Sequence, residues 1–305
     1  MKRSGAILAL CAALALAIAC AAAEEAGSPY TENEWNYVDG SMDVSGGIPE
    51  DAEGVLWSIR EAGVLRVATE PYFPPQEFID PELTGQERFA GSDMQMARRI
   101  AQRMGVELEI VPMEFSQVLD AVADGSCDLA ISALSFTPGR AATVTMSKGY
   151  YYSDQGMGGA LLIRTEDADA ITRVEDLAGR DIVAQALSLQ ETLLAENVQN
   201  YRQFRRLSQV KDVFDAVSDG SADAAMVDPG TAASYIEANP DCGLMLVPGA
   251  SFSLDEQYQG DRVAAKKGEL QLMYFVNGVI DELLSSGEYE TWYAQAEDRA
   301  AELDM

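Results

Sequence analysis

One stretch of the sequence joins a buried strand to side chains that can bind a small anion. Residues 128–140 run Asp-Leu-Ala-Ile-Ser-Ala-Leu-Ser-Phe-Thr-Pro-Gly-Arg, so a short apolar strand leads into a hydroxyl-rich turn. Ser132, Ala133 and Ser135 lie at the end of this strand, where open α/β sheets bind ligands. The planar guanidinium of Arg140 adds N–H donors that can bind a carboxylate through two hydrogen bonds. The stretch predicts half of a small-molecule site, although an arginine after Pro-Gly is also common in solvated loops.

A repeat places a carboxylate at the equivalent point of the second half of the chain. The segment 118–131 returns 95 residues later as 213–226, and both copies contain Asp-Gly-Ser-x-Asp. The second copy leads directly to Asp228. If the two copies face each other, Arg140 and Asp228 flank one cleft, and that arrangement suits a zwitterion. The alternative is that Asp228 only caps the helix predicted at 230–238.

The composition excludes several classes of function. The 305 residues are 48% hydrophobic, which is enough for one large core or for two of about 100–150 residues each. A net charge of −29 argues against a nucleic-acid partner, because two polyanions repel each other. The chain contains no histidine, which excludes Ser-His-Asp catalysis and histidine metal sites. It also lacks a phosphate-binding glycine loop and a Cys-x-x-Cys pair, so we expect no cofactor and no metal.

The N-terminal region has the features of an export signal. A basic start precedes an apolar run from Ala6 to Ala19, which is too short to span a bilayer comfortably. We predict a signal peptide at 1–19 that resembles a lipoprotein signal, with Cys20 as the lipidated first residue. The alternative is ordinary cleavage after an Ala-x-Ala. Residues 20–59 are rich in acidic side chains, so we predict a solvated tether that holds an exported domain at the membrane.

Strands alternate with helices through the rest of the chain. Apolar residues alternate with glutamates at 106–110, which is typical of a strand, and one apolar face recurs from Ser92 to Met104, which is typical of a helix. The prolines of 69–75 forbid regular structure there. Alternation of this kind predicts an α/β fold with mainly parallel sheets flanked by helices, and the repeat indicates two lobes of similar build.

From about residue 60 to its end, the chain resembles the family 3 extracellular solute-binding proteins, the amino-acid receptors of ABC importers. The matching motifs lie, in chain order, at residues 65–78, 91–97, 125–132, 135–140, 150–152, 174–179 and 223–228. The resemblance implies the two-lobed type II periplasmic-binding-protein fold, which closes on its ligand by a hinge movement. It places lobe 1 at 60–157 plus 258–305, lobe 2 with the hinge strands at 158–257, and the crossings near 158–164 and 257–266.

The same resemblance assigns roles to single residues. The arginine matching Arg140 holds the ligand α-carboxylate, and the residues matching Ser135 and Asp228 receive the α-ammonium. The aromatic matching Phe73 covers the ligand side chain. The predicted ligand-binding residues are therefore Glu70, Tyr72, Phe73, Ser132, Ala133, Ser135, Arg140, Gln185, Ser188, Leu189 and Asp228.

Lobe 2 departs from the family pattern where relatives have a Gly-Thr or Gly-Ser turn. This chain has Gln-Ala-Leu-Ser-Leu-Gln-Glu at 185–191. Ser188 and Glu191 keep the spacing of a capping box, so the donors of a helix N-terminus are retained. Leu187 and Leu189 predict a tighter or drier pocket on this side.

We predict a monomeric exported receptor, in the periplasm or on the outer face of the membrane. It captures a small amino acid, polar or basic, and delivers it to an ABC importer permease. Glu70 favours a basic or polar ligand, but it fits a solvated strand end equally well. One alternative is an exported cyclohexadienyl dehydratase-like enzyme on the same scaffold, with Glu70 or Glu77 as the acid. Another is a sensory binding protein that does not take part in transport.

Overall fold

The computed structural model describes residues 29–153, 156–303 and 305, so the predicted signal peptide and Cys20 lie outside the described residues. The chain divides into two compact units, Met1–Thr31 and Glu32–Met305. The second unit contains every described helix and strand. In the described ranges, no helix combines the length and the apolar character needed to cross a bilayer.

The first lobe is built on a five-stranded sheet with the order β5-β1-β6-β13-β7. Its strands are β1 (Val64–Thr69), β5 (Glu107–Pro112), β6 (Leu129–Ser135), β7 (Val144–Met146) and β13 (Asp261–Lys266). β1 runs parallel to β5 and β6, whereas β13 runs antiparallel to β6 and β7. The helices of this lobe are α2 (Gly54–Ala62), α3 (Ser92–Met104), α4 (Phe115–Asp124), α5 (Pro138–Thr143), α9 (Leu270–Ser286) and α10 (Glu288–Glu302). A small antiparallel sheet follows β1, with strands β2 (Tyr72–Phe73), β3 (Glu77–Ile79) and β4 (Phe89–Ala90).

The second lobe repeats this plan with the strand order β10-β9-β11-β8-β12. Its strands are β8 (Gly158–Arg164), β9 (Asp181–Gln185), β10 (Gln203–Leu207), β11 (Ala224–Val227) and β12 (Leu244–Ser253). Its helices are α6 (Leu189–Asn197), α7 (Val210–Ser218) and α8 (Pro229–Ala238). β9 runs parallel to β10 and β11, and β8 runs antiparallel to β11 and β12. The predicted two-lobed α/β fold is confirmed, and each sheet is mixed because one antiparallel strand follows each crossing between the lobes.

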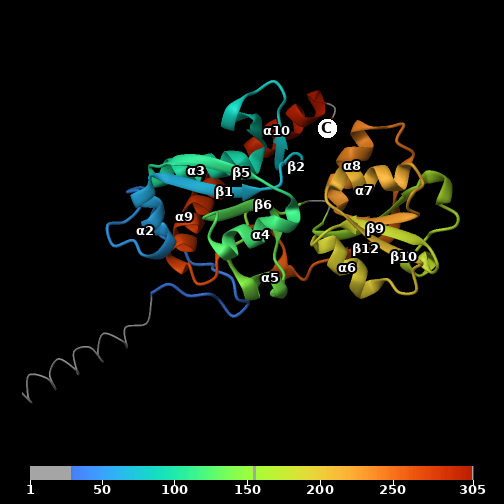
Figure 1. Ribbon diagram of the computed structural model, residues 1–305, viewed down its shortest axis with the longest axis horizontal. Helices are drawn as coiled ribbons and strands as arrows, with labels where there is room; N and C mark the ends of the chain where they lie inside the picture. Colours follow the sequence, from blue (N-terminus) through green and yellow to red (C-terminus); the bar gives the residue numbers. More distant parts are fainter. Residues whose placement is uncertain (1–28, 154–155, 304) are drawn as a thin grey trace, which may run out of the picture. The chain divides into compact units, whose positions relative to one another are not determined.

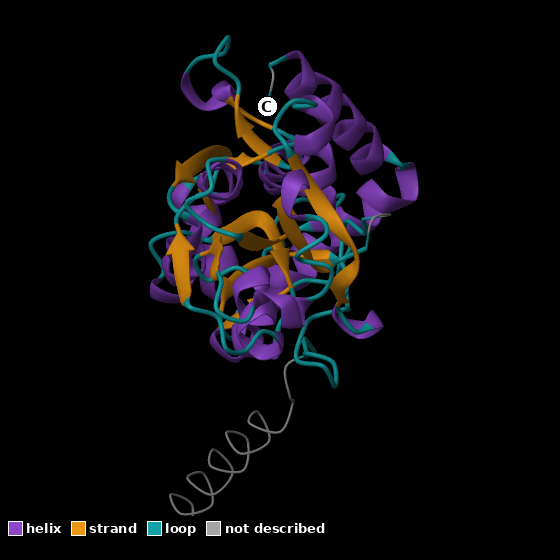
Figure 2. Cartoon of the chain, turned by 90° about the vertical axis from the view of Figure 1, so that its right-hand side faces the viewer, coloured by secondary structure: helices purple, strands orange, loops and turns teal. Residues whose placement is uncertain are grey.

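Alternation of apolar side chains along the strands gives each sheet two covered faces. In lobe 1, Leu65 and Val67 pack in the cluster that contains α3 and α9 side chains, whereas Ala68 packs in the cluster that contains α4. In lobe 2, Ile182 packs with α6 side chains and Val183 with those of α7. Figure 1 shows α6 and α7 on opposite sides of the second sheet, and Figure 2 shows helices around the strands. Both sheets are therefore buried layers, and their free ends carry the functional side chains.

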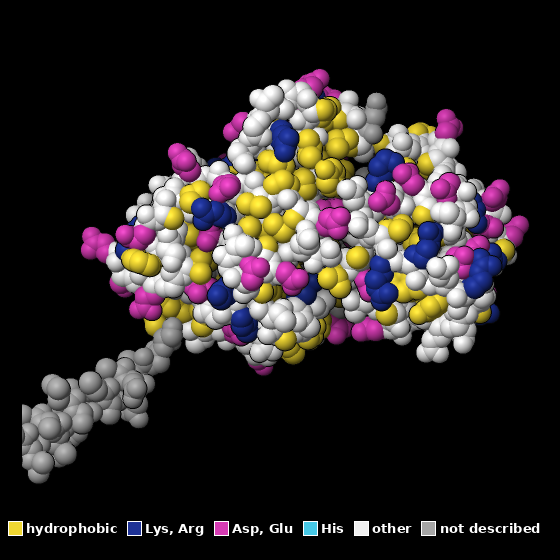
Figure 3. Space-filling view, in the orientation of Figure 1, with side chains coloured by type: hydrophobic (Ala, Val, Ile, Leu, Met, Phe, Trp, Pro, Cys, Tyr) yellow, Lys and Arg dark blue, Asp and Glu magenta, His cyan; other side chains and the backbone are white. Residues whose placement is uncertain are grey.

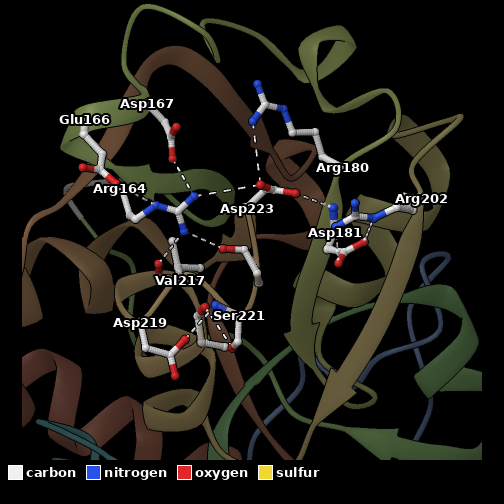
Figure 4. A network of polar contacts seen from close by, with 12 residues as sticks. Arg164, Glu166, Asp167, Arg180, Asp181, Arg202, Val217, Asp219, Ser221 and Asp223 are labelled. Carbon is white, nitrogen blue, oxygen red and sulfur yellow. Dashed lines mark hydrogen bonds and ion pairs between the residues drawn. The ribbon is translucent and has the colours of Figure 1, made fainter.

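The sequence repeat forms the same helix-to-strand corner in both lobes. In lobe 1, a carboxylate oxygen of Asp128 accepts the backbone N–H of Arg66 at 2.8 Å. In lobe 2, Asp223 accepts the backbone N–H of Asp181 at 2.7 Å, and Arg164 lies 3.9 Å from the same carboxylate (Figure 4). Each aspartate ties the start of its strand to the neighbouring parallel strand. The repeated motif therefore sets the position of β6 and β11, whose far ends point toward the site.

Two chain crossings connect the lobes, and they lie beside each other. Asp261 exchanges backbone hydrogen bonds with Tyr150 and Tyr151, each 2.9 Å long. The predicted crossing ranges need correction, because 158–164 forms β8 of the second sheet and most of 257–266 forms β13 of the first. The connecting segments precede those strands, at 147–157 and 254–260. Arg262 holds them together by donating to the carbonyls of Ser147, Gln257 and Gln259.

The structure corrects the predicted acidic tether, because residues 32–59 are part of the folded lobe. Val38 and Val44 are buried in the lobe 1 core, and α2 packs beside them. Asn277 donates hydrogen bonds of 2.8 Å to the carbonyls of Val38 and Gly40, and Tyr37 stacks on Arg262 with 3.9 Å between the guanidinium carbon and the ring centre. Most acidic residues of this segment are exposed, while Val38, Val44, Leu56 and Ile59 insert into the core. On the face shown in Figure 3, acidic side chains are spread among Lys and Arg.

Candidate functional site

A cleft lies where the carboxyl ends of β1 and β6 in lobe 1 meet those of β9 and β11 in lobe 2. It encloses about 720 Å³ when its open mouth is counted, and residues of both lobes line it. The lobes contact each other across it: Arg140 donates to the carbonyl of Leu187 at 3.1 Å, and Gln185 donates to Glu70 at 3.3 Å. Side chains of both lobes, including those that follow each sequence repeat, therefore border one space.

Arg140 is a half-buried cation at one side of this cleft. Thr137 caps α5 and accepts the backbone N–H of Arg140 at 3.1 Å, which fixes the start of the helix. The guanidinium donates to the carbonyls of Ser135 at 2.8 Å and Leu187 at 3.1 Å. Burial lowers the pKa of Arg140 to about 10, so it stays charged at neutral pH. No described carboxylate forms an ion pair with it, so N–H donors remain for an anion.

Asp228 is the corresponding carboxylate from lobe 2. One of its oxygens accepts the backbone N–H of Thr231 at 2.8 Å and the hydroxyl of the same residue at 3.1 Å. Asp228 therefore caps α8, as one interpretation of the sequence held, and it also lines the cleft. Burial raises its pKa, and the hydrogen bonds from Thr231 oppose this shift. No described cation forms an ion pair with Asp228, so its carboxylate can receive an ammonium group.

The lobe 1 side of the cleft is acidic. We define the acidic floor as Glu70, Gln76, Glu77 and Asp261, all of which are buried and line the cleft. Burial raises the pKa of Glu70 to about 8. Burial also raises the pKa of Asp261 well above its usual range, as do the charges of Asp93 and Asp228, while a hydrogen bond from Gln76 lowers it.

Asp93 lies behind the floor and shapes the turn at the end of β6. Its carboxylate accepts Tyr150 OH at 2.7 Å, Tyr289 OH at 2.8 Å and the backbone N–H of Ala133 at 3.0 Å. Ala133 adopts a φ of +44°, a conformation that L-residues rarely take. Asp93 thus holds a strained turn that presents Ala133 and Ser135 to the cleft.

The lobe 2 wall is the N-terminus of α6. Ser188 caps this helix by accepting the N–H of Glu191 at 3.0 Å, and Glu191 accepts the N–H of Leu187 at 2.7 Å, so the capping interaction extends one residue further back. Leu187 has a φ of +58° and its side chain is 60% exposed. The expectation that Leu187 narrows the pocket is therefore wrong; its carbonyl enters the site instead, as an acceptor for Arg140. Leu189 is buried and lines the cleft.

The structure brings nine of the eleven predicted residues to the cleft. These are Glu70, Phe73, Ala133, Ser135, Arg140, Gln185, Ser188, Leu189 and Asp228. Tyr72 is outside it, because successive residues of β2 point to opposite faces and its ring is 42% exposed. Ser132 lies beneath the lining, where its hydroxyl donates to Glu77 and accepts the backbone N–H of Glu70, both at 3.0 Å.

Several lining residues were not predicted from the sequence. They include Gln76, Phe115, Tyr151, Asp261 and Tyr293, while Glu77 was predicted only as a possible acid of the alternative enzyme. Glu77 follows Phe73 by four residues in the aromatic loop, so the turn back into β3 could have been used to place it. Asp261 and Tyr293 come from the C-terminal return of the chain, and nothing in their local sequence indicates the cleft.

Two α/β lobes enclose a cleft in which a cation and a carboxylate have no ion-pair partner among the residues that the structure describes, and this is the arrangement of a two-lobed solute-binding protein. Comparison of the sequence with protein families agrees: residues 65–296 match the bacterial extracellular solute-binding proteins, family 3. The chain belongs to this family.

Relatives include both receptors and an enzyme. A probable histidine-binding protein of Campylobacter jejuni is 28% identical over 233 residues, covering 74% of this chain and 82% of its own length. The solved structure of the ABC transporter substrate-binding protein AbpA from Streptococcus pneumoniae, bound to L-arginine, is 30% identical with a TM-score of 0.70, covering 80% of this chain and 99% of that one. The cyclohexadienyl dehydratase of Pseudomonas aeruginosa is 28% identical over 177 residues, covering 58% of this chain and 63% of its own length.

Proposed function

We propose that this protein is the extracytoplasmic receptor of an ABC importer and that it captures one free amino acid between its lobes. The observation that carries the proposal is the presence of Arg140 and Asp228 in one cleft, each without an ionic partner among the described residues. Arg140 binds the α-carboxylate, and Asp228 receives the α-ammonium. The receptors of histidine and arginine among the relatives support this assignment.

Energetics favour a ligand that satisfies both charges. An amino acid has about ten heavy atoms, and the best small ligands gain about 1.5 kcal/mol per atom, so micromolar binding at about −8 kcal/mol uses much of what is available. A buried charge left without a partner costs several kcal/mol. A zwitterion that meets Arg140 and Asp228 together gains from both contacts, whereas a monofunctional acid or amine leaves one of them unpaired.

We further propose that the protein is exported, that Cys20 is lipidated, and that a monomer delivers its ligand to a permease. The family assignment supports an extracytoplasmic location. The basic start, the apolar run and Ala17-Ile18-Ala19-Cys20 support the anchor. Metabolic labelling with a palmitate analogue tests the anchor, because the change Cys20→Ala abolishes labelling if the assignment holds.

A second candidate function is dehydration of a prephenate-like acid. Its support is the related dehydratase, together with Glu70, whose pKa of about 8 would keep it protonated as a general acid at neutral pH. The receptor is the better-supported function, because Arg140 and Asp228 fit both ends of a zwitterion.

Thermal unfolding with a panel of amino acids, prephenate and arogenate separates the two candidates. A ligand at 100 times its Kd adds about 2.7 kcal/mol of stability. Stabilisation by an amino acid without turnover supports the receptor. Conversion of prephenate or arogenate supports the enzyme, and the absence of both effects contradicts the proposed function.

A further inference from the structure

The cleft contains more carboxylates than the backbone of one amino acid can use. Asp228 suffices for the α-ammonium and Arg140 for the α-carboxylate. Glu70, Glu77 and Asp261 then remain on the acidic floor, and none of them forms a salt bridge within the described part of the chain. Burial of carboxylates is costly unless they are paired or protonated. The floor therefore needs either protons or a second cation.

Two oxygens of the floor also lack hydrogen-bond donors. In the described ranges, Glu77 Oε2 and Gln76 Oε1 are fully buried and accept no hydrogen bond from a fixed donor. Glu77 Oε1 is satisfied by the hydroxyl of Ser132 at 3.0 Å, and the amide of Gln76 donates to Asp261. Unsatisfied buried acceptors are rare in folded proteins, so Gln76 Oε1 leaves a place on the floor for a donor, whereas the Glu77 carboxyl group is also hydrogen-bonded to Asp93.

An organic cation has the charge and the donors that such a floor can bind. The described residues contain no cluster of three Asp, Glu or Cys side chains arranged to hold a metal ion. A guanidinium offers five N–H donors and an ammonium offers three, and both match separated acceptors on a floor of this kind.

Glu77 is surrounded by other ionisable groups on every side. Glu70 comes from the end of β1, Asp93 from α3 and Asp261 from β13, and the charges of all three act on Glu77. The other ionisable groups that act on these three neighbours are Arg140, Asp228, Glu114, Tyr150 and Tyr289. Arg140 is the sole cation among them, and it lies on the side of the cleft assigned to the α-carboxylate.

We propose that the acidic floor is a subsite for the side-chain cation of a basic amino acid, that Glu77 determines this specificity, and that the cation enters in exchange for a proton. This inference rests on the proposed function and names its ligand class: an α-amino acid whose side chain ends in a guanidinium or an ammonium. The exchange is balanced, because a floor carboxyl group becomes a carboxylate paired with the ligand cation and its proton leaves to the solvent.

Local electrostatics identify which groups carry the proton. Burial, followed by the charges of Asp93 and Glu70, raises the pKa of Glu77 well above its usual range. Asp93 and Glu77 are hydrogen-bonded to each other, and Asp93 also accepts three hydrogen bonds from fixed donors, so Asp93 is the ionised member of this pair and Glu77 is the protonated one. Glu70, with a pKa of about 8, is also mostly protonated at pH 7. A cation on the floor lowers the pKa of both, and a proton is released.

Calorimetric titration of the mature protein with L-arginine and L-citrulline tests this exchange. Citrulline has the shape of arginine but a neutral side chain. The contributions of Asp228 and Arg140 to binding and to proton release are therefore the same for both ligands and cancel when the two titrations are compared. Titrations in two buffers of different ionisation enthalpy give the number of protons released. We expect arginine to release about one proton more than citrulline, and its Kd to fall up to about tenfold per pH unit from pH 5 to 7 relative to that of citrulline. Equal proton release, or tighter binding of citrulline, overturns the inference.

The change Glu77→Gln tests the assigned residue. Glutamine keeps the size and the contact with Ser132 but cannot become an anion. We expect arginine to bind at least tenfold more weakly relative to citrulline than in the wild type, with less excess proton release. Glu107→Gln is the matched control, because Glu107 lies exposed at the start of β5 and should change nothing. Unchanged arginine binding by Glu77→Gln overturns the role of Glu77.

These outcomes are distinct from failure of the proposed function. If no amino acid binds, the receptor assignment fails. If arginine and citrulline both bind with equal proton release, the receptor assignment stands and the exchange fails. If citrulline binds too weakly to titrate, arginine on the wild type and on Glu77→Gln gives the same comparison, and equal proton release by the two proteins overturns the exchange.

Discussion

Replacing Arg140 with alanine is the most informative perturbation of the cleft. In the unliganded protein the guanidinium makes two hydrogen bonds to carbonyls, at 2.8 and 3.1 Å, and stacks 5.6 Å from the ring centre of Phe115. Each hydrogen bond from a charged donor contributes about 1.5–3 kcal/mol, and removing a half-buried cation that has no counter-ion offsets much of that loss. We therefore expect the unliganded variant to fold, with a free energy of unfolding within about 2 kcal/mol of the wild type.

Ligand binding should respond far more strongly. Truncation of one partner of a buried, hydrogen-bonded charge pair costs about 2–5 kcal/mol, which corresponds to a Kd about 30- to 4,000-fold higher. At a ligand concentration of 100 times the wild-type Kd, the wild type gains about 2.7 kcal/mol, and the variant gains less than about 1 kcal/mol. At about 2–4 °C per kcal/mol, the Tm shift falls from about 5–11 °C to below about 4 °C.

Differential scanning fluorimetry with L-arginine measures this shift, and calorimetry gives the Kd directly. Arg66→Ala is the matched control: Arg66 is a half-exposed arginine of the same lobe, with its Nε 3.1 Å from Glu109 at the surface. Surface pairs of this kind contribute at most about 1 kcal/mol. A full ligand-induced shift in Arg140→Ala would show that Arg140 does not hold the carboxylate.

Three further changes test other parts of the structure. The pKa of Glu70 is about 8 in the folded protein, against the usual value of 4.5 that we take for the unfolded chain. The protonated Glu70 side chain therefore contributes fully to the free energy of unfolding below pH 4.5, and this contribution is lost as the pH rises through 8. Glu70→Gln should remove up to about 5 kcal/mol of pH dependence from the unliganded protein, and Tm profiles that match the wild type would contradict this. Tyr289→Phe removes the 2.8 Å hydrogen bond to Asp93 and should lower the free energy of unfolding by about 1.5–3 kcal/mol in urea titrations; no change would show that the bond is not stabilising. Val38→Ala should cost about 1–3 kcal/mol in the same assay, whereas a residue in a free tether would cost nothing.

Local signals in the sequence were sufficient to predict the two lobes and to place Arg140 and Asp228, the two opposite charges, at the cleft. The alternation of strands and helices and the repeated Asp-Gly-Ser-x-Asp place β6 and β11. Arg140 follows the end of β6, and Asp228 follows the end of β11. The position of Arg140 after Pro-Gly was predictable for the same reason, since the turn must follow the strand. Tyr72 was misplaced because a two-residue strand sends neighbouring side chains to opposite faces, and composition does not show which face is inward.

The remaining features depend on long-range contacts. Asp261 reaches the cleft only because β13 returns between β6 and β7, a pairing that no local pattern predicts. Residues 32–59 were expected to be solvated because their composition is acidic. Asn277 of α9, more than 200 residues away, donates hydrogen bonds to two of their backbone carbonyls. Leu187 was expected to fill the pocket, but its positive φ turns the side chain outward. For Asp261 and for residues 32–59 the partner lies too far along the chain for composition or spacing to indicate it, whereas for Leu187 the deciding feature is a local backbone conformation that composition does not reveal.

The most direct test is a crystal structure of the mature protein grown with L-arginine. The account predicts one molecule in the cleft, with its carboxylate on Arg140, its α-ammonium on Asp228 and its guanidinium on the acidic floor at Glu77. A ligand bound in the reverse orientation, or a cleft that stays empty at millimolar arginine, would contradict it.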